Sequence, residues 1–112
     1  MEILFRTDKL KRLCCDSQAA RKQWSKQLAD KLRRRLDELR DADTLDHVRT
    51  LPQAHCEELK GNRKGQLSVR LEGGHRLIFE PADDPFPRKP DGGLDWRGVR
   101  TIRIISVEDY HD

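Results

Sequence analysis

The sequence predicts a small α+β domain in which an N-terminal strand and helices precede an antiparallel sheet. Its 112 residues suit one domain with a single core, which we expect to span residues 1–112. Apolar side chains recur every three or four residues before Pro52 and alternate with polar ones after it. Gly73-Gly74 lies between two alternating runs, which is typical of a hairpin. We therefore expect helices on one face of the sheet.

The chain begins with a predicted strand and a short helix. Residues 2–5 (EILF) are short and apolar, and polar residues follow them. Asp8 is expected to cap a helix formed by the KLKRLCC that follows. Thr44 is expected to cap one further helical turn, which ends before Pro52.

The longest predicted helix carries a narrow apolar stripe. Ser17 or Ser25 is its expected N-cap, and it runs to about Asp41. The stripe consists of Trp24, Leu28, Leu32, Leu36 and Leu39. This spacing indicates packing against the core, so Arg33-Arg34-Arg35 is expected on the solvent side of the helix.

Strands are expected after Pro52 at residues 55–60, 66–72, 75–80 and 100–107. In the second of these, Leu67, Val69 and Leu71 alternate with Ser68, Arg70 and Glu72. The polar set is therefore expected to face solvent. Gly61-Asn62 is expected to form the turn before this strand.

The Pro/Gly-rich residues 81–99 predict a long loop before the last strand. They hold four of the five prolines. A loop of this length is uncommon in a compact domain and is often functional. Trp96 and Phe86 are expected to anchor it to the body of the protein.

Composition narrows the functional classes. The net charge is +3, and residues 1–40 hold 12 of the 23 Lys/Arg but only 6 of the 20 Asp/Glu, which suits an anionic partner. No apolar run approaches the ~20 residues that span a bilayer, and no signal-peptide core is visible, so we expect a cytoplasmic protein. Cys14, Cys15 and Cys56 show no metal-binding spacing and are expected to be reduced thiols.

Three motifs together resemble one family. They are LKGNRKGQLSVR (59–70), HRLIF (75–79) and DYH (109–111), and LADKLRRRLDELRDA precedes them. This order is similar to the RelE/HigB superfamily of type II toxins, whose members often read L-x-G-D/N-R-x-G-x-x-S-I/V-R, then W-R-I/L-x-F, and end in D-Y-H. The resemblance implies a RelE-like fold and a metal-independent, ribosome-associated mRNA endoribonuclease without a cofactor. It also implies a cognate helix-turn-helix antitoxin, which would bind DNA only as part of the complex.

The resemblance also implies catalytic residues. RNA cleavage without a metal needs a base for the 2′-OH, a cation for the phosphate and an acid for the leaving oxygen. Arg76 matches the family's phosphate-binding arginine, and a guanidinium can hold two phosphate oxygens. Asp109 and Tyr110 match the terminal DY, and His111 is a histidine that can titrate near neutral pH. Glu57 stands where the family often has an acid–base histidine, and His55 is the expected substitute on the same strand face.

Further cations are expected to bind the RNA backbone. Lys60, Arg63 and Lys64 lie in and beside the predicted turn, and Arg70 lies on the polar face of the following strand. As a group they indicate a cationic groove.

Two other functions stay open. A ParE-like relative would poison DNA gyrase without cutting RNA, but such chains usually lack the terminal DYH and the dense basic strand. A degenerate member would keep only partner binding, because one acid–base group carries ~10²–10⁴ of rate and Glu57 replaces the usual histidine.

Overall fold

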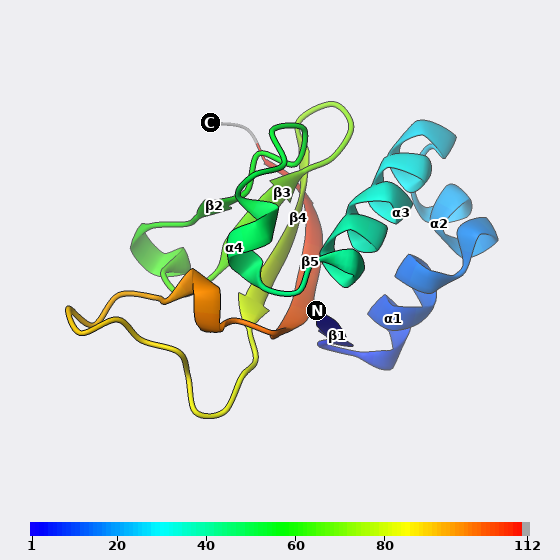
Figure 1. Ribbon diagram of the computed structural model, residues 1–112. Coiled ribbons are helices and arrows are strands. Elements are labelled where there is room, and N and C mark those ends of the chain that lie inside the picture. Colours follow the sequence, from blue (N-terminus) through cyan, green and yellow to red (C-terminus); the bar gives the residue numbers. More distant parts are fainter. Residues whose placement is uncertain (111–112) are drawn as a thin grey trace.

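The computed structural model describes residues 1–110 and has the α+β class that the sequence predicts (Figure 1). The helical half comprises β1 (Glu2–Phe5), α1 (Asp8–Cys15), α2 (Ser17–Gln23), α3 (Lys26–Asp41) and α4 (Leu45–Val48). The sheet half comprises β2 (Glu57–Glu58), η1 (Gly61–Arg63), β3 (Leu67–Arg70), β4 (His75–Pro81), η2 (Trp96–Gly98) and β5 (Thr101–Asp109). The elements η1 and η2 are 3₁₀ turns.

One five-stranded sheet has the order β1-β5-β4-β3-β2. Neighbouring strands are antiparallel except for β1 and β5, which pair in parallel from Glu2↔Thr101 to Phe5↔Ile104. Parallel strands require a long crossover, and here almost the whole chain connects the pair. The N-terminal strand therefore lies at the edge of the sheet, beside the last strand.

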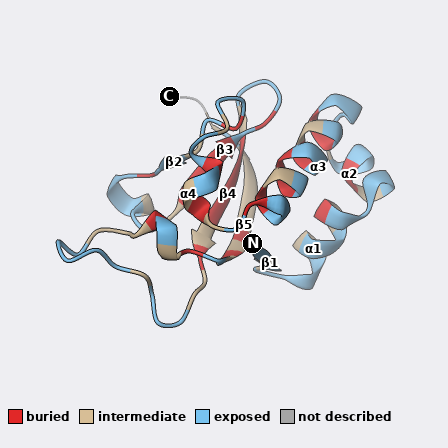
Figure 2. Cartoon of the chain, in the orientation of Figure 1, coloured by how far each residue is buried: buried red, intermediate tan, exposed pale blue. Residues whose placement is uncertain are grey.

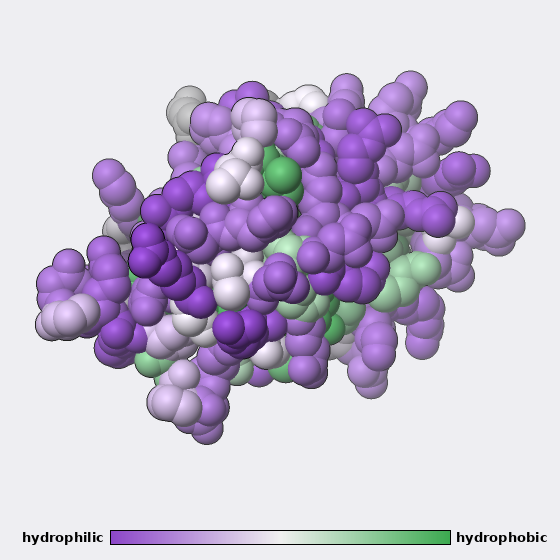
Figure 3. All heavy atoms as spheres, viewed as in Figure 1, coloured by the Kyte–Doolittle hydropathy of each residue, from purple (hydrophilic) through white to green (hydrophobic). Residues whose placement is uncertain are grey.

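The helices share a core with one face of the sheet. The apolar side chains of α3 are buried with those of the inner strands, and α1 and α4 add Cys14, Leu45 and Val48 to the same cluster. Figure 2 shows the buried positions on the inner side of α3 and along β3 and β4. The outer surface in Figure 3 is mostly hydrophilic, in keeping with the 38% of charged residues.

Local capping explains why the helical stretch divides. The hydroxyl of Thr7, rather than the expected Asp8, caps α1 by accepting from the Leu10 N–H at 3.1 Å. Of the two expected caps, Ser25 is confirmed, because its hydroxyl accepts from the Leu28 N–H at the start of α3, which ends at Asp41. Ser17 is not a cap: Asp16 caps a separate helix, α2, which stops before Trp24. Trp24 ends α2 and still packs against the core.

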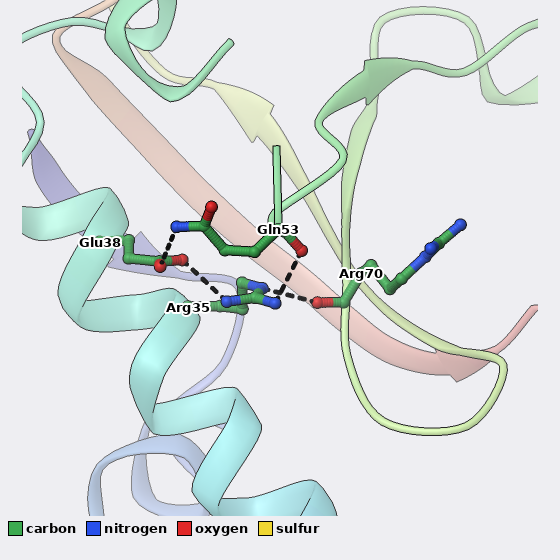
Figure 4. A network of polar contacts seen from close by, with 4 residues as sticks. All are labelled: Arg35, Glu38, Gln53 and Arg70. Carbon is green, nitrogen blue, oxygen red and sulfur yellow. Dashed lines mark hydrogen bonds and ion pairs between the residues drawn. The ribbon is translucent and has the colours of Figure 1, made fainter. Parts of the chain in front are cut away.

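Arg35 corrects the expectation that the arginine run faces solvent. It is only 4% exposed, because the 3.6-residue period places it on the face that carries the apolar stripe. Its Nε donates to the Arg70 carbonyl at 2.8 Å and its Nη2 to the Gln53 carbonyl at 2.7 Å (Figure 4). Its Nη1 binds Glu38 at 3.0 Å, and Gln53 also donates to Glu38. One guanidinium thus joins α3 to β3 and to the segment before β2.

The strands differ from the prediction in two respects. Ser68 is fully buried rather than facing solvent, because its hydroxyl accepts from the Arg76 guanidinium. The first strand after Pro52 covers only Glu57–Glu58, since His55 has a left-handed backbone with φ of 46°. The hairpin at Gly73-Gly74 is confirmed: the His75 N–H donates to the Glu72 carbonyl across the turn, where Gly73 has φ of +59°.

The loop at 81–99 has an internal structure of its own. Trp96 is buried as expected, and its indole N–H donates to Glu58 at 3.1 Å. The expectation for Phe86 was wrong, because its side chain is exposed and lies against Arg88. No helix within residues 1–110 is long and apolar enough to cross a membrane.

Candidate active site

Sheet register brings charged side chains together on the face opposite the helices. Arg70 pairs with Arg76, and Arg76 pairs with Glu108, across three neighbouring strands. These three residues alternate with Leu77 and Val107, which join the core. The charged side chains of β3, β4 and β5 therefore share one face.

Arg76 is held in one orientation at the centre of this face. Its Nε donates to the Ser68 hydroxyl at 2.8 Å and its Nη2 to the His55 carbonyl at 3.1 Å. The same Nη2 lies 3.0 Å from Glu57 Oε1. Within residues 1–110, Nη1 has no hydrogen bond or ion pair. Arg76 is only 8% exposed, and it lines a cleft at the hairpin end of the sheet.

His55 and Glu57 meet although β2 does not reach His55. The left-handed backbone of His55 directs its carbonyl to Arg76, and its ring Nε2 lies 3.9 Å from Glu57 Oε2. Both side chains are about half exposed. The Glu57 carboxylate thus lies between an imidazole and a guanidinium, where a proton acceptor and a phosphate-binding group would be adjacent.

Arg63 and Glu108 form the second charged pair of the site. Arg63 Nη1 donates to Glu108 Oε2 at 3.1 Å, Nη2 binds Oε1, and the Ser106 hydroxyl donates to Oε2 at 2.6 Å. The hydrogen bonds from Arg63, and then that from Ser106, hold the pKa of Glu108 below its usual range despite partial burial. The same pair raises the pKa of Arg63. Because η1 lies beside β3 and Glu108 lies on β5, the Arg63 side chain crosses the open face.

Tyr110 closes one side of the site. Its backbone N–H donates to the Gly74 carbonyl at 2.9 Å, which fastens the end of the chain to the hairpin. The ring centroid lies 5.8 Å from the Arg63 guanidinium carbon and 6.0 Å from that of Arg76. A cleft of about 340 Å³ opens here; it is lined by Arg70, Leu71, Gly73, Gly74, His75, Arg76 and Tyr110.

The thiol nearest the site offers no ready nucleophile. Cys56 directly precedes Glu57, and burial raises the pKa of its thiol to about 12. It therefore stays protonated at neutral pH. Within residues 1–110, no three His, Cys, Asp or Glu side chains are grouped to hold a metal ion.

Comparisons with known proteins identify the family and agree with the fold. Residues 3–86 match the model of the HigB-like toxin family, described as the RelE-like toxin of the type II toxin–antitoxin system HigB. This match covers most of the chain. The chain belongs to the HigB-like toxin family. The predicted resemblance to type II toxins is thereby confirmed.

Solved structures show that the HigB-like chain shares its fold with other toxins. A YoeB–YefM complex from Staphylococcus aureus matches with 21% identity and a TM-score of 0.56, over 100% of this chain and 98% of that one. A YoeB/ParE toxin from Agrobacterium tumefaciens matches with 14% identity and a TM-score of 0.55, over 99% and 100%. A YoeB dimer from S. aureus matches with 22% identity and a TM-score of 0.52, over 100% and 98%. No curated protein matches.

The remaining predicted site residues of this HigB-like toxin are scattered. Lys60 and Lys64 flank η1 and are exposed, outside the cleft. Asp109 pairs with His75 and follows Glu108 on β5. Because side chains alternate along a strand, Asp109 lies on the face of the sheet opposite to Arg76 and Glu108. His111 lies outside the described residues.

Sequence reasoning missed two site residues, Ser68 and Glu108. Ser68 shares the strand face of Arg70, and the register across Gly73-Gly74 puts it near Arg76. That register was a usable signal. Glu108 lies two residues before Tyr110. The pairing of Arg76 with Glu108 shows that Glu108, and not Asp109, is the carboxylate of β5 on the same face as Arg76.

Proposed function

We propose that this HigB-like toxin is a metal-independent, ribosome-associated mRNA endoribonuclease that a cognate antitoxin neutralises in the cytoplasm. One observation carries the proposal: Arg76 is oriented by Ser68 and the His55 carbonyl, and it lines a cleft beside Glu57 and Tyr110. A pre-oriented guanidinium stabilises the charge that grows on an attacked phosphate.

In the proposed reaction, a phosphate oxygen binds Arg76 and competes with the carboxylate of Glu57, which lies 3.0 Å from Nη2. Once released from this ion pair, Glu57 accepts the proton of the RNA 2′-OH. The O2′–P bond forms as the P–O5′ bond breaks, which yields a 2′,3′-cyclic phosphate and a free 5′-hydroxyl. In this proposal Glu57 is the base and Arg76 is the cation that binds the phosphate.

Tyr110 is the proposed proton donor to the leaving 5′-oxygen. Its ring lies near the guanidinium groups of Arg63 and Arg76, so its hydroxyl belongs to the same site as the phosphate-binding arginine. His55, whose Nε2 lies 3.9 Å from Glu57 Oε2, is proposed to pass the proton that Glu57 has accepted to water. His111 and Asp109 remain proposed members of the site.

Exposed cations are proposed to hold the RNA backbone. Arg70 lines the cleft, and Lys60 and Lys64 extend the positive surface beyond it. Arg63 contributes less to this attraction than we expected from the sequence, because Glu108 neutralises it.

A cognate antitoxin is the proposed partner. The likeness to the YoeB–YefM complex from S. aureus supports it, as does the excess of Lys/Arg over Asp/Glu in residues 1–40. An acidic segment that covers a basic site would inhibit RNA binding directly. We expect the antitoxin to carry the helix-turn-helix and to contact DNA.

The experiment is inducible expression of the chain in bacteria without its partner, followed by mapping of new 5′ ends. New ends inside translated codons support the proposal, and they should vanish in Arg76→Ala and Arg76→Lys but persist in Arg12→Ala, an exposed arginine of α1. Thermal melting of each purified variant separates loss of the site from loss of the fold. Growth arrest with intact transcripts and a DNA-damage response would replace the proposal with a gyrase-type target. No arrest by the wild-type chain would indicate a partner-binding remnant.

A further inference from the structure

A larger cleft lies beside the proposed active site. It measures about 850 Å³, within the ~300–1,000 Å³ typical of ligand sites. Residues of α4 and β2 form one wall, and residues 88–97 of the long loop form the other. Glu57 also lines this cleft, while its carboxylate is ion-paired with Arg76. Arg76 lines the smaller cleft and Glu57 the larger one, so their ion pair links the two.

The loop wall is built by its own hydrogen bonds. Lys89 N–H donates to the Gly93 carbonyl at 2.8 Å, and Asp95 N–H donates to the Pro87 carbonyl at 3.0 Å. A Cβ at Gly98 would lie 2.7 Å from the Cβ of Pro87, so only glycine allows this close approach. The cleft is thus preformed, which lowers the entropic cost of binding a ligand.

Trp96 attaches the loop wall to β2 and to the end of α4. Its indole N–H donates to Glu58, and the Arg49 guanidinium lies 4.2 Å above its ring centroid. Arg49 in turn lies 3.7 Å from Asp46. Contact with both α4 and β2 makes Trp96 a reporter of whatever enters the cleft.

The rim of the cleft presents cations with weak or no anionic partners. Within residues 1–110, the Arg97 guanidinium makes no hydrogen bond or ion pair. Lys89 lies 3.8 Å from Asp91, but the two side chains are 53% and 71% exposed, so solvent screens this pair. In the described part of the chain, the Arg88 guanidinium donates to the Gly92 carbonyl at 3.2 Å and lies 4.7 Å from the Phe86 ring centroid, with no carboxylate partner.

The carboxylates that line the cleft are already engaged. Glu57 binds Arg76, Glu58 accepts from Trp96, and Asp95 accepts from the Arg97 backbone N–H at 3.1 Å. Asp46 faces Arg49. Glu58 and Asp95 accept from uncharged N–H groups and therefore keep their negative charge. The cations that remain for a ligand are those of the rim, chiefly Arg88 and Arg97.

We infer that this cleft is a second RNA subsite, which holds nucleotides adjacent to the one cleaved at Arg76. This inference rests on the proposed function, which places one phosphate of the RNA at Arg76. RNA fits because it carries a phosphate at every nucleotide, so a strand with one phosphate at Arg76 brings others past Glu57 toward the loop. Arg88, Lys89 and Arg97 bind those phosphates, and the guanidinium planes can stack on bases. The loop thereby becomes part of the substrate-binding surface.

The test uses the full chain with Trp24→Phe, which leaves Trp96 as the only tryptophan. The probe is a short single-stranded RNA with 2′-O-methyl groups, which block attack by the 2′-oxygen. We expect it to change Trp96 fluorescence. A variant with Arg88, Lys89 and Arg97 changed to alanine should bind at least about tenfold more weakly. Its slope of log K against log salt should be shallower by about 2, since each phosphate contact on a single strand contributes ~0.7.

The matched control changes three exposed lysines of the helical half, Lys9, Lys22 and Lys26, to alanine. Equal losses of affinity and slope in the control and loop variants would overturn the subsite, and so would an unchanged Trp96 signal with RNA. A Trp96 response to a poly-aspartate peptide but not to RNA would overturn it in favour of an acidic protein partner. RNA binding in the cleft without RNA cleavage would refute the nuclease and leave the subsite standing.

Discussion

Arg35 offers the sharpest test of how the fold holds the site. Its buried guanidinium donates to the carbonyl oxygens of Arg70 and Gln53 and pairs with Glu38 (Figure 4). Arg35→Met keeps the stem but removes these contacts. Removing one member of a buried charged network costs about 3–5 kcal/mol, because the remaining polar groups lose their partners. We expect a loss of that size in the free energy of unfolding.

The assay is equilibrium unfolding in urea, with Arg34→Met as the matched control. Arg34 is exposed on the same helix, and exposed substitutions usually change stability by less than about 0.5 kcal/mol. Arg35→Lys should lie between the wild type and Arg35→Met, since an ammonium retains the charge without the fork of donors. If Arg35→Met unfolds within about 1 kcal/mol of the control, the network does not hold α3 to β3 and the reasoning is refuted.

Three further outcomes are expected. Because the pKa of Glu108 is lowered in the fold, its pairing with Arg63 stabilises the protein at pH values above its ordinary pKa of 4.5, and this stabilisation is lost as pH falls through the folded pKa. The free energies of unfolding in urea of wild type and Glu108→Gln should therefore differ at neutral pH and converge in acid. A difference that persists in acid would contradict this. Of the three thiols, exposed Cys15 should react fastest with iodoacetamide in native protein, because burial raises the pKa of Cys14 and Cys56 to about 12; mass spectrometry of the labelled peptides would expose an error if all three react alike. Gly98→Ala should loosen the loop against Pro87, so the fluorescence of Trp96 should shift to the red and be quenched more strongly by solvent. An unchanged spectrum would count against the close packing.

Local patterns predicted much of this fold. The apolar stripe of α3 and the Gly73-Gly74 turn depend on residues close in sequence, and both were correct. The parallel pairing of β1 with β5 joins the two ends of the chain, so no local pattern reports it. The period of α3 does put Arg35 on the buried face, but its charge favoured a solvent position, and its partners Gln53 and Arg70 lie far along the chain.

The candidate site was predictable in its centre and less so at its rim. Arg76 and Arg70 face each other because the hairpin sets their register. The choice between Glu108 and Asp109 depends on the pairing of β4 with β5 across the long loop, where the register also shifts at Ile78/Phe79. That shift leaves no mark in the sequence.

The most direct test of the central claim is the chemistry of the RNA ends. Purified chain is incubated with ribosomes that carry a defined mRNA, in parallel with Arg76→Lys and Glu57→Gln. The account predicts cuts that require the ribosome, leave a 2′,3′-cyclic phosphate and a 5′-hydroxyl, and fall by about 10²-fold or more in both variants. Cuts that leave a 5′-phosphate, or that continue unchanged in both variants, would contradict it.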